Sequence, residues 1–597
     1  MAFSSLRRSR GDQRHGSSAT SGGWAFAQVV PCFGDVSLLR GIELTSASTI
    51  WTVAVLAVLS AVVAAVLLPW TLPARARTRP AEPADVPGPT DAADTADGPG
   101  TAEIPTKPTT EPASPTPGRA SARAVLRAVG RYTARAVMVG VPVLLVVVLG
   151  GLLINRPMHY VRTLGDVIEA AAPRTQGASR VTPLPDPSVY DAVPASAWKA
   201  TFQDAGDGSQ EATWTGPVSG IRLPVRVIVP SGYRPDDGRT YNVIEGIHGW
   251  VGDPQSLVTG MTSPKQLQEA IDAGRIPPSI MVLPSVNVDG GQHDCVNIAG
   301  RPAVETWTAE EIPRMIRATF PNVSTQRAGW MLMGISAGAY CAARTAYDVP
   351  QRFGAVGVMS SSDSPGEGAL AHSGKQLRAE NTLSTMLGKR TPDGLRFYVM
   401  GAQDDSSGEA RAAWFMEDSV QAPDSVTIDT PVQGGHSWVL WNDRFPSLLT
   451  WWGSDPEVFA AAGLPAPGGD PWAKARADGV KPLTETPRDQ RTAGSISPMR
   501  AAPFEINGLG TIIVAVVASL ATVGIALAWA PRWGRRREGD SPSGLRLVGA
   551  IVGRFAVVMV AASLIATTVG IGVNAGGGFY TSWRDLRASV RMNNQAG

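Results

Sequence analysis

Gly334-Ile335-Ser336-Ala337-Gly338 is the segment whose residue types and spacing best suit covalent chemistry. It follows the apolar run Trp330–Met333 and precedes a good helix former at 339–347. A strand, a Gly-x-Ser-x-Gly turn and a helix form a nucleophile elbow, in which the glycines permit a sharp turn that exposes the serine hydroxyl. We therefore expect Ser336 to be a nucleophile.

A serine hydroxyl needs a base, and after a nucleophile elbow the chain order is serine, acid, histidine. Only His372 and His436 follow Ser336 in the sequence. His372 lies in a polar stretch and is expected at the surface. His436 lies in a glycine-rich loop before a predicted helix, Trp438–Trp452, and is the predicted base.

The acid should follow the strand after the nucleophile unit, which is Arg396–Met400. The turn after this strand contains Asp404, at a Gly-x-x-Asp spacing, and this residue is our predicted acid. A carboxylate here would orient the imidazole and stabilise its charged form. Asp405 and Glu409 are the alternatives in the same turn.

An oxyanion requires backbone N–H donors. One is expected from Ala337, directly after the nucleophile, and the other from Trp250, in the His248-Gly249-Trp250 segment after a strand. Gly249 allows close approach of the chain. We expect His248, which precedes this glycine, to shape the loop rather than to act as a base.

Short apolar runs around these residues alternate with helical patterns. Predicted strands are Arg222–Val229, Asn242–Ile247, Ser279–Val286, Gly329–Met333, Ala355–Met359 and Arg396–Met400. Strands that alternate with helices indicate a parallel sheet covered on both faces. The predicted fold class is therefore α/β, with a mostly parallel sheet and helices on both faces.

Composition indicates membrane segments beside this soluble domain. The chain has 597 residues, a formal net charge of +2, 17% charged residues and a mean hydropathy of +0.00. Balanced charge argues against a nucleic-acid binder. Four windows free of acidic and basic residues are long enough to cross a bilayer: Leu44–Ala74, Ala136–Asn155, Ile506–Pro531 and Phe555–Trp583.

Arginines cluster in the connection within each pair of spans. The first connection contains Arg75, Arg77, Arg79, Arg119, Arg123, Arg127, Arg131 and Arg135, and the second contains Arg532, Arg535, Arg536, Arg537 and Arg546. The positive-inside rule places both connections in the cytoplasm. The central segment and both chain termini are then expected outside the plasma membrane.

Ten prolines among small and polar residues at 80–118 indicate a disordered linker. The predicted division is a tail at 1–45, spans at 46–70, 134–155, 506–530 and 548–574, the linker at 71–133, connectors at 156–197 and 456–505, the catalytic domain at 198–455, a basic loop at 531–547 and a tail at 575–597.

A weak internal sequence repeat supports the view that the two pairs of spans are equivalent. Asn155, Tyr160, Leu164 and Asp166 follow the second span, and Asn574, Phe579, Trp583 and Asp585 recur at equal spacing after the fourth.

Residues 198–455 resemble the esterase D family, which includes S-formylglutathione hydrolases, feruloyl esterases and mycolyltransferases. The resemblance rests on His248-Gly249-Trp250, Gly334–Gly338, Gly401-x-x-Asp404 and Gly435-His436-Ser437-Trp438, in family order. It implies an α/β-hydrolase fold, acyl-enzyme chemistry that needs no cofactor or metal, and a triad of Ser336, Asp404 and His436. The mycolyltransferase branch uses a glutamate as its acid. The flanking spans are similar to those of membrane-anchored actinobacterial members.

The chain contains three cysteines, Cys32, Cys295 and Cys341, too few for a four-cysteine zinc site. Cys295 and Cys341 are both expected near the site, and an outward domain tolerates disulfides. We therefore expect these two residues to pair, and the alternative is two isolated buried thiols.

Together these features predict an extracytoplasmic serine esterase or acyltransferase that acts on esters of envelope lipids or glycans. The bilayer is its other expected partner. The alternative is a catalytically silent protein that binds or organises the envelope.

Overall fold

The computed structural model describes residues 41–72, 117–158, 161–171, 177–288, 292, 294–366, 368–405, 408–491, 502–534 and 544–595. Cys32, Tyr160, most of the predicted N-terminal tail, the linker residues 73–116 and the loop residues 535–543 lie outside this part of the chain.

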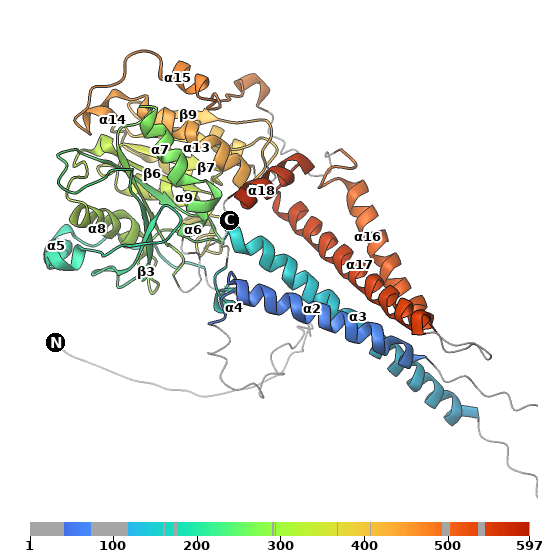
Figure 1. The fold of residues 1–597 in the computed structure, drawn as a ribbon. Helices are drawn as coiled ribbons and strands as arrows, with labels where there is room; N and C mark the ends of the chain where they lie inside the picture. Colours follow the sequence, from blue (N-terminus) through green and yellow to red (C-terminus); the bar gives the residue numbers. More distant parts are fainter. Residues whose placement is uncertain are drawn as a thin grey trace, which may run out of the picture.

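Within the described residues, nine strands form one sheet, in the order β1-β2-β3-β5-β4-β6-β7-β8-β9. Figure 1 shows strands of this sheet inside the domain, with helices around them. From β5 to β9 all neighbouring strands are parallel, while β1, β2 and β3 continue the sheet antiparallel. The strands are β1 Gln203–Asp204, β2 Gln210–Thr215, β3 Arg222–Ile228, β4 Asn242–Ile247, β5 Ser279–Pro284, β6 Trp330–Ile335, β7 Ala355–Met359, β8 Arg396–Met400 and β9 Ser425–Asp429. The predicted α/β architecture is confirmed.

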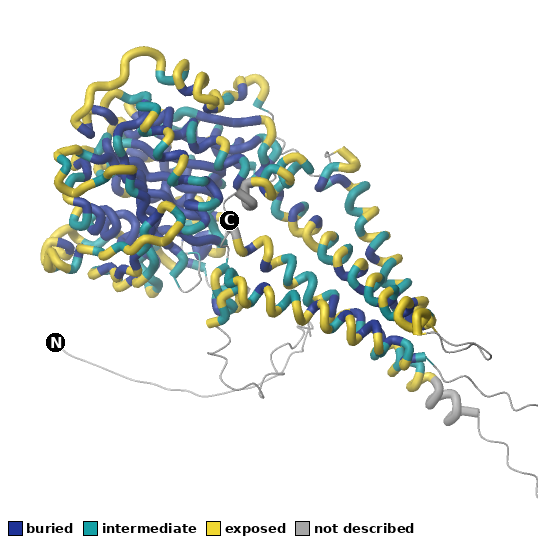
Figure 2. Tube along the Cα trace, viewed as in Figure 1, coloured by how far each residue is buried: buried dark blue, intermediate teal, exposed yellow. Residues whose placement is uncertain are grey.

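Both faces of the sheet are covered by helices, as its apolar strands require. One apolar core joins the sheet to α8 Ile312–Thr319, α9 Ala337–Asp348, α11 Leu383–Lys389 and α12 Glu409–Ser419. A second core on the other face joins it to α6 Pro254–Gly260, α7 Ser263–Asp272 and α13 Trp438–Gly453. Figure 2 shows these two cores as the buried interior of the domain.

Short helices complete the domain and its connections. They are α4 Leu164–Ala171, α5 Pro187–Asp191, α10 Lys375–Glu380, α14 Pro456–Ala460, α15 Pro471–Ala477 and α18 Trp583–Gln595.

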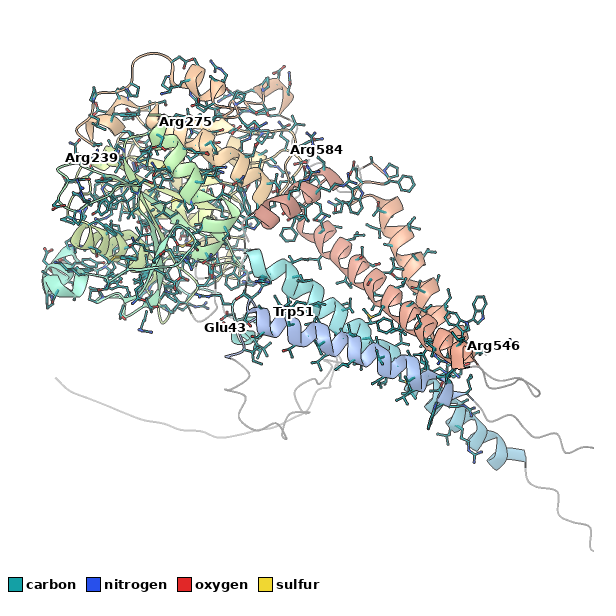
Figure 3. The ribbon with its side chains drawn as sticks, in the orientation of Figure 1. Glu43, Trp51, Arg239, Arg275, Arg546 and Arg584 are labelled. Carbon is teal, nitrogen blue, oxygen red and sulfur yellow. A yellow bond between two sulfur atoms is a disulfide. The ribbon has the colours of Figure 1, made fainter. Side chains whose placement is uncertain are left out.

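Among the residues that the structure describes, four helices are long and apolar enough to cross a membrane, two before the domain and two after it. They are α2 Ala47–Leu67, α3 Pro117–Met158, α16 Leu509–Gly524 and α17 Gly544–Gly577. All four extend from the same side of the domain (Figure 1). Figure 3 shows Glu43 and Trp51 at the domain end of the first pair and Arg546 at the far end of the second.

Helix α3 begins earlier than the predicted span at 134–155. The helix starts at Pro117, so residues 117–133, which were predicted to belong to a disordered linker, are helical. The reason is local composition: after the last proline of this stretch, alanine and arginine dominate, and both residues have high helix propensity.

The two helix pairs make equivalent contacts, which supports the repeat seen in the sequence. In the first pair, Asn155 Nδ2 donates to Val161 O at 2.7 Å and Val161 N donates back to Asn155 Oδ1 at 2.9 Å. In the second pair, Asn574 and Tyr580 exchange the same two hydrogen bonds at 2.9 and 2.8 Å. Each asparagine thus closes a turn where the chain leaves the helix.

Two buried arginines extend this equivalence to the far ends of the pairs. Arg135 precedes Asn155 by the same number of residues as Arg554 precedes Asn574. Arg135 donates to Thr71 O at 3.3 Å, and Arg554 donates to Trp533 O at 2.9 Å. In both pairs the second helix therefore holds the backbone that follows the first.

Candidate active site

The catalytic candidates come from the carboxyl ends of neighbouring parallel strands. Ser336 follows β6, Asp404 and Asp405 follow β8, and His436 lies between β9 and α13. Since β6 to β9 are adjacent and parallel, their carboxyl ends meet at one edge of the sheet. Ligand sites of open α/β sheets lie at this edge.

Ser336 occupies the strained turn expected of a nucleophile elbow. Its φ of 55° and ψ of −126° lie outside the regions that most residues adopt. The flanking glycines are required: a Cβ at Gly334 would lie 2.0 Å from Gly338 O, and one at Gly338 would lie 2.3 Å from Ile247 O. The fold thus fixes the serine backbone on both sides.

His436 lies between the serine hydroxyl and two acids. Ser336 Oγ lies 2.8 Å from His436 Nε2, and Nδ1 of the same ring lies 3.1 Å from Asp405 Oδ2. Nδ1 also contacts Glu409 Oε1. With carboxylates at Nδ1, the ring proton resides on that nitrogen, so Nε2 is free to accept the proton of Ser336.

Asp404, the acid favoured from the sequence, lies elsewhere. Its oxygens accept hydrogen bonds from Gly435 N at 2.8 Å, Gly434 N at 3.3 Å and Thr581 Oγ1 at 2.7 Å. Asp404 therefore binds the backbone of the histidine loop rather than the imidazole, and the structure corrects the predicted role. Consecutive acids in one turn point in different directions, and Asp405, 1% exposed, is the one that faces the ring.

The charges at His436 are strongly shifted by burial and by one another. Burial raises the pKa of Glu409 to about 8, and the neighbouring His436 acts in the opposite direction. Burial alone would lower the pKa of His436, but the carboxylates of Glu409 and Asp405 outweigh it and hold that pKa well above its ordinary value. Perturbed groups that face a nucleophile are typical of catalytic sites.

The same three groups could instead ligate a metal ion. Donor atoms of Asp405, Glu409 and His436 lie within 4.8 Å of one another. Two carboxylates and one imidazole are common ligands, but they are also the groups that orient a catalytic imidazole. The direction of Nε2 towards Ser336 Oγ favours the second use.

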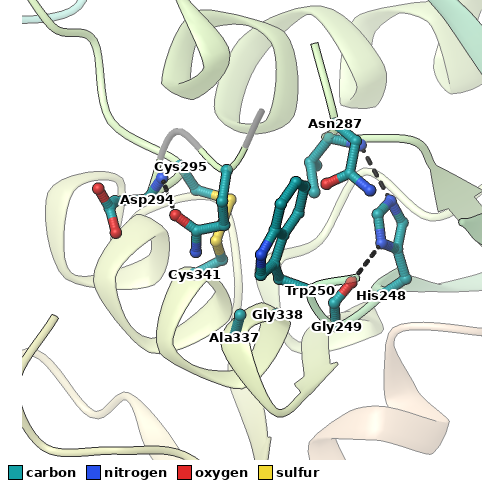
Figure 4. A pocket seen from close by; sticks show the side chains of 11 residues that line it. His248, Gly249, Trp250, Asn287, Asp294, Cys295, Ala337, Gly338 and Cys341 are labelled. Carbon is teal, nitrogen blue, oxygen red and sulfur yellow. Dashed lines mark hydrogen bonds between the residues drawn. A yellow bond between two sulfur atoms is a disulfide. The ribbon is translucent and has the colours of Figure 1, made fainter. Parts of the chain in front are cut away.

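A small pocket beside the serine is lined by both predicted oxyanion residues, Trp250 and Ala337 (Figure 4). Gly249 allows the chain next to Trp250 to approach Ser336, because a Cβ at this glycine would lie only 3.1 Å from Ser336 Cβ. Ala337 begins α9, where the backbone N–H groups of the first turn have no partner within the helix.

His248 shapes this loop. Its Nδ1 donates to Gly249 O at 2.9 Å, and its Nε2 accepts from Val286 N at 3.1 Å (Figure 4). Burial lowers the pKa of His248 to about 4, so the ring is neutral and both nitrogens are engaged. His372 is exposed, in line with the sequence expectation.

A disulfide joins Cys295 to Cys341 on the opposite wall of this pocket, with the two Cα atoms 5.2 Å apart. It ties the loop after β5 to the nucleophile helix α9. In Figure 4 the Trp250 indole lies between this disulfide and Asn287.

Sequence reasoning missed one aromatic contact at the base. Trp441 packs edge-on against the His436 ring, with centroids 5.0 Å apart, and its Nε1 donates to Ser360 Oγ at 2.9 Å. Its place one turn into the predicted helix after His436 was the available signal.

Comparison with known families agrees with this geometry. Residues 218–451 match the model of the family described as "Putative esterase". The matched range contains the serine, the histidine and all three candidate acids. It supports a carboxylic-ester hydrolase and confirms the resemblance seen in the sequence.

Solved structures similar to this chain include esterases. A ferulic acid esterase shares 18% identity at a TM-score of 0.35, over 41% of this chain and 97% of its own. An S-formylglutathione hydrolase from Agrobacterium tumefaciens shares 14% identity at a TM-score of 0.35, over 42% of this chain and 98% of its own. The enterobactin esterase of Shigella flexneri shares 16% identity at a TM-score of 0.33, over 41% of this chain and 59% of its own. No curated protein matches the chain.

Proposed function

We propose that this chain is a membrane-anchored serine hydrolase that forms an acyl-enzyme on Ser336. The observation that carries the proposal is the hydrogen-bonded series from Ser336 Oγ through His436 to Asp405, at 2.8 and 3.1 Å. The same series in a strand-elbow-helix context is the arrangement that activates a serine in many unrelated hydrolases.

The geometry supports the following steps. Ser336 Oγ attacks the ester carbonyl carbon while its proton passes to His436 Nε2. The carbon–oxygen bond to the alcohol then breaks, and the leaving oxygen takes that proton. A water molecule or a second hydroxyl then attacks the acyl carbon while its proton passes to His436 Nε2. When the bond from that carbon to Ser336 Oγ breaks, His436 gives this proton to the serine oxygen, which restores the hydroxyl. Asp405 stabilises the imidazolium during both halves.

Two amides are proposed to hold the oxyanion, those of Trp250 and Ala337. Support comes from their place in one pocket beside the serine and from the close approach that Gly249 permits. Preorganised amides aimed at the developing charge are a major source of rate enhancement in acyl transfer.

Membrane anchoring is supported by apolar side chains exposed along all four long helices. Examples are Leu59 at 55%, Leu144 at 64%, Leu520 at 67% and Val573 at 61% exposed. Contiguous apolar surface of this extent requires a partner, and lipid is the partner that fits helices of this length.

The positions of the basic residues support an outward-facing domain. Arg546 lies at the end of α17 far from the domain (Figure 3), and Arg532 lies in the same connection. By the positive-inside rule that end is cytoplasmic. Esters of envelope lipids or glycans are then the substrates within reach, with water as acceptor in an esterase and a hydroxyl in a transferase.

A membrane-impermeant fluorophosphonate added to intact cells tests nucleophile and sidedness together. We expect covalent labelling of Ser336, found by peptide mass spectrometry, and none in Ser336→Ala. Labelling only after permeabilisation would invert the orientation and leave the hydrolase in place. Failure of the purified protein to react would contradict the catalytic assignment.

A further inference from the structure

The segment that leaves the last membrane helix touches the loop that holds the catalytic base. We call residues 578–582, between α17 and α18, the exit segment. Helix α18, which follows it, contacts α13, the helix that begins directly after the histidine loop (Figure 1). The membrane part and the catalytic loop are therefore in direct contact.

Two hydrogen-bonded connections join the exit segment to the histidine loop, by which we mean residues 434–437. His436 N donates to Gly578 O at 3.2 Å. Thr581 Oγ1 donates to Asp404 Oδ2 at 2.7 Å, and Asp404 accepts in turn from Gly435 N at 2.8 Å. The backbone of Gly435, next to His436, is thus connected to Thr581 through the carboxylate of Asp404.

The loop sequence permits this close contact. Gly435 has a φ of +55°, and a Cβ there would lie 2.9 Å from Gly578 O. A side chain at this position would push the loop away from the exit segment. The absence of a side chain at Gly435 therefore allows the histidine loop to contact the exit segment.

The exit segment is itself fixed to the ends of both helices of its pair. Asn574 exchanges two hydrogen bonds with the Tyr580 backbone, and Asn507 Nδ2 also donates to Tyr580 O at 2.9 Å. Trp583 Nε1 donates to Phe504 O at 2.8 Å. Thr581 lies between Tyr580 and Trp583, which these hydrogen bonds hold in place. The Thr581 hydroxyl therefore has a fixed position from which it donates to Asp404.

The first pair makes the corresponding contact on the other side of the pocket. Arg162 follows Asn155 at the same spacing as Thr581 follows Asn574. Arg162 Nε lies 3.5 Å from Asp253 Oδ2, and Asp253 ends the Trp250 loop and caps α6. Equivalent positions of the two pairs thus contact carboxylates on the two loops that flank Ser336. The Arg162 side chain is 45% exposed, so solvent screens this ion pair.

We propose that the exit segment is a positioning element for catalysis, in which Thr581 acts through Asp404 to hold His436 at the distance needed by Ser336. The proposal rests on the proposed role of His436 as base. It assigns Asp404, adjacent to the acid at the imidazole, to the support of the loop backbone. It also makes the membrane hairpin part of the catalytic framework rather than an anchor alone.

The test uses the full-length protein in lipid vesicles and a short p-nitrophenyl ester. Thr581→Val removes the donor while keeping the side-chain shape, and we expect kcat to fall about tenfold with KM unchanged, as expected for one lost hydrogen bond. Thr581→Ser, which restores the donor, should return kcat close to wild type. Thr567→Val is the matched control, because Thr567 Oγ1 donates within its own helix α17, to Ser563 O.

Asp404→Asn provides a second, independent variant. It should also lower kcat, and combining it with Thr581→Val should cause no further loss, since both act through one connection. Wild-type kcat in Thr581→Val would overturn the positioning role while leaving the proposed function intact. A fall in kcat that Thr581→Ser does not rescue would also overturn it. Absence of Ser336-dependent turnover in the wild-type protein would instead overturn the proposed function, and this inference with it.

Discussion

Asp405 Oδ2 lies 3.1 Å from His436 Nδ1, on the side of the imidazole opposite the nucleophile. Such a carboxylate keeps the ring proton on Nδ1 and stabilises the imidazolium. Glu409 is the second acid at this nitrogen, and burial raises its pKa to about 8.

Asp405→Asn should therefore be the most damaging change among the three acids. We expect kcat to fall about 100-fold or more, because the amide favours the wrong tautomer and offers no charge. Asp404→Asn should cost only about tenfold, and steady-state kinetics on an activated ester would measure both. Equal losses in the two variants would contradict this assignment of the acids.

The pH dependence of kcat/KM should reveal the raised pKa of His436. A base must be neutral to accept a proton, so activity is lost as pH falls through that pKa, and the acid limb should lie above pH 6.5. Glu409→Gln removes a carboxylate that raises the pKa of His436, and should move the limb to lower pH. A limb at or below the ordinary histidine value in the wild-type enzyme would rule this account out.

Gly249→Ala should impair chemistry without unfolding the domain. The added Cβ would lie 3.1 Å from Ser336 Cβ and 3.7 Å from its hydroxyl oxygen, which displaces the Trp250 loop. Small misplacements in an active site cost about 10-fold to 100-fold in rate. Gly388→Ala, where a Cβ meets nothing within 4 Å, is the control. Similar kcat values for the two variants would exclude a role for this close approach.

The disulfide should stabilise the domain. Cys295 and Cys341 are 46 residues apart in sequence, and closing a loop of this length stabilises by about 2–4 kcal/mol. Replacing both by serine should lower the unfolding temperature, measured by scanning calorimetry in detergent. Cys32→Ser leaves both cysteines of the pair in place and is the matched control. Alkylation of both thiols without reductant would show that the bond is absent.

Short apolar runs made the central sheet predictable. The predicted bounds of β4, β7 and β8 agree with the structure. Strand β9 was not expected, since Ser425–Asp429 alternates weakly and lies partly exposed at the edge of the sheet. Strands β1 and β2 were also missed. These two strands belong to the antiparallel part of the sheet, in which β1 pairs with β2 and β2 with β3. Local periodicity in the sequence does not reveal this pairing.

The positions of the candidate nucleophile and base, Ser336 and His436, could be predicted from motifs because glycine placement constrains the backbone around them. The acid could not, since Asp404 and Asp405 are chemically identical neighbours and only the turn decides which side chain faces the imidazole. Contacts between the exit segment and the histidine loop lie equally beyond the reach of motifs. They join Thr581 to Asp404 across most of the second half of the chain.

The order of these two residues along the chain has a consequence for biosynthesis. A ribosome completes Asp404 and the whole esterase-like domain before it reaches Thr581, which follows α17. Domains generally fold as units while the rest of the chain is still being made. The domain would thus fold first with its histidine loop unsupported and gain full turnover only when the final hairpin has inserted. With the membrane anchoring proposed above, newly made protein would then stay weakly active until α16 and α17 have entered the bilayer.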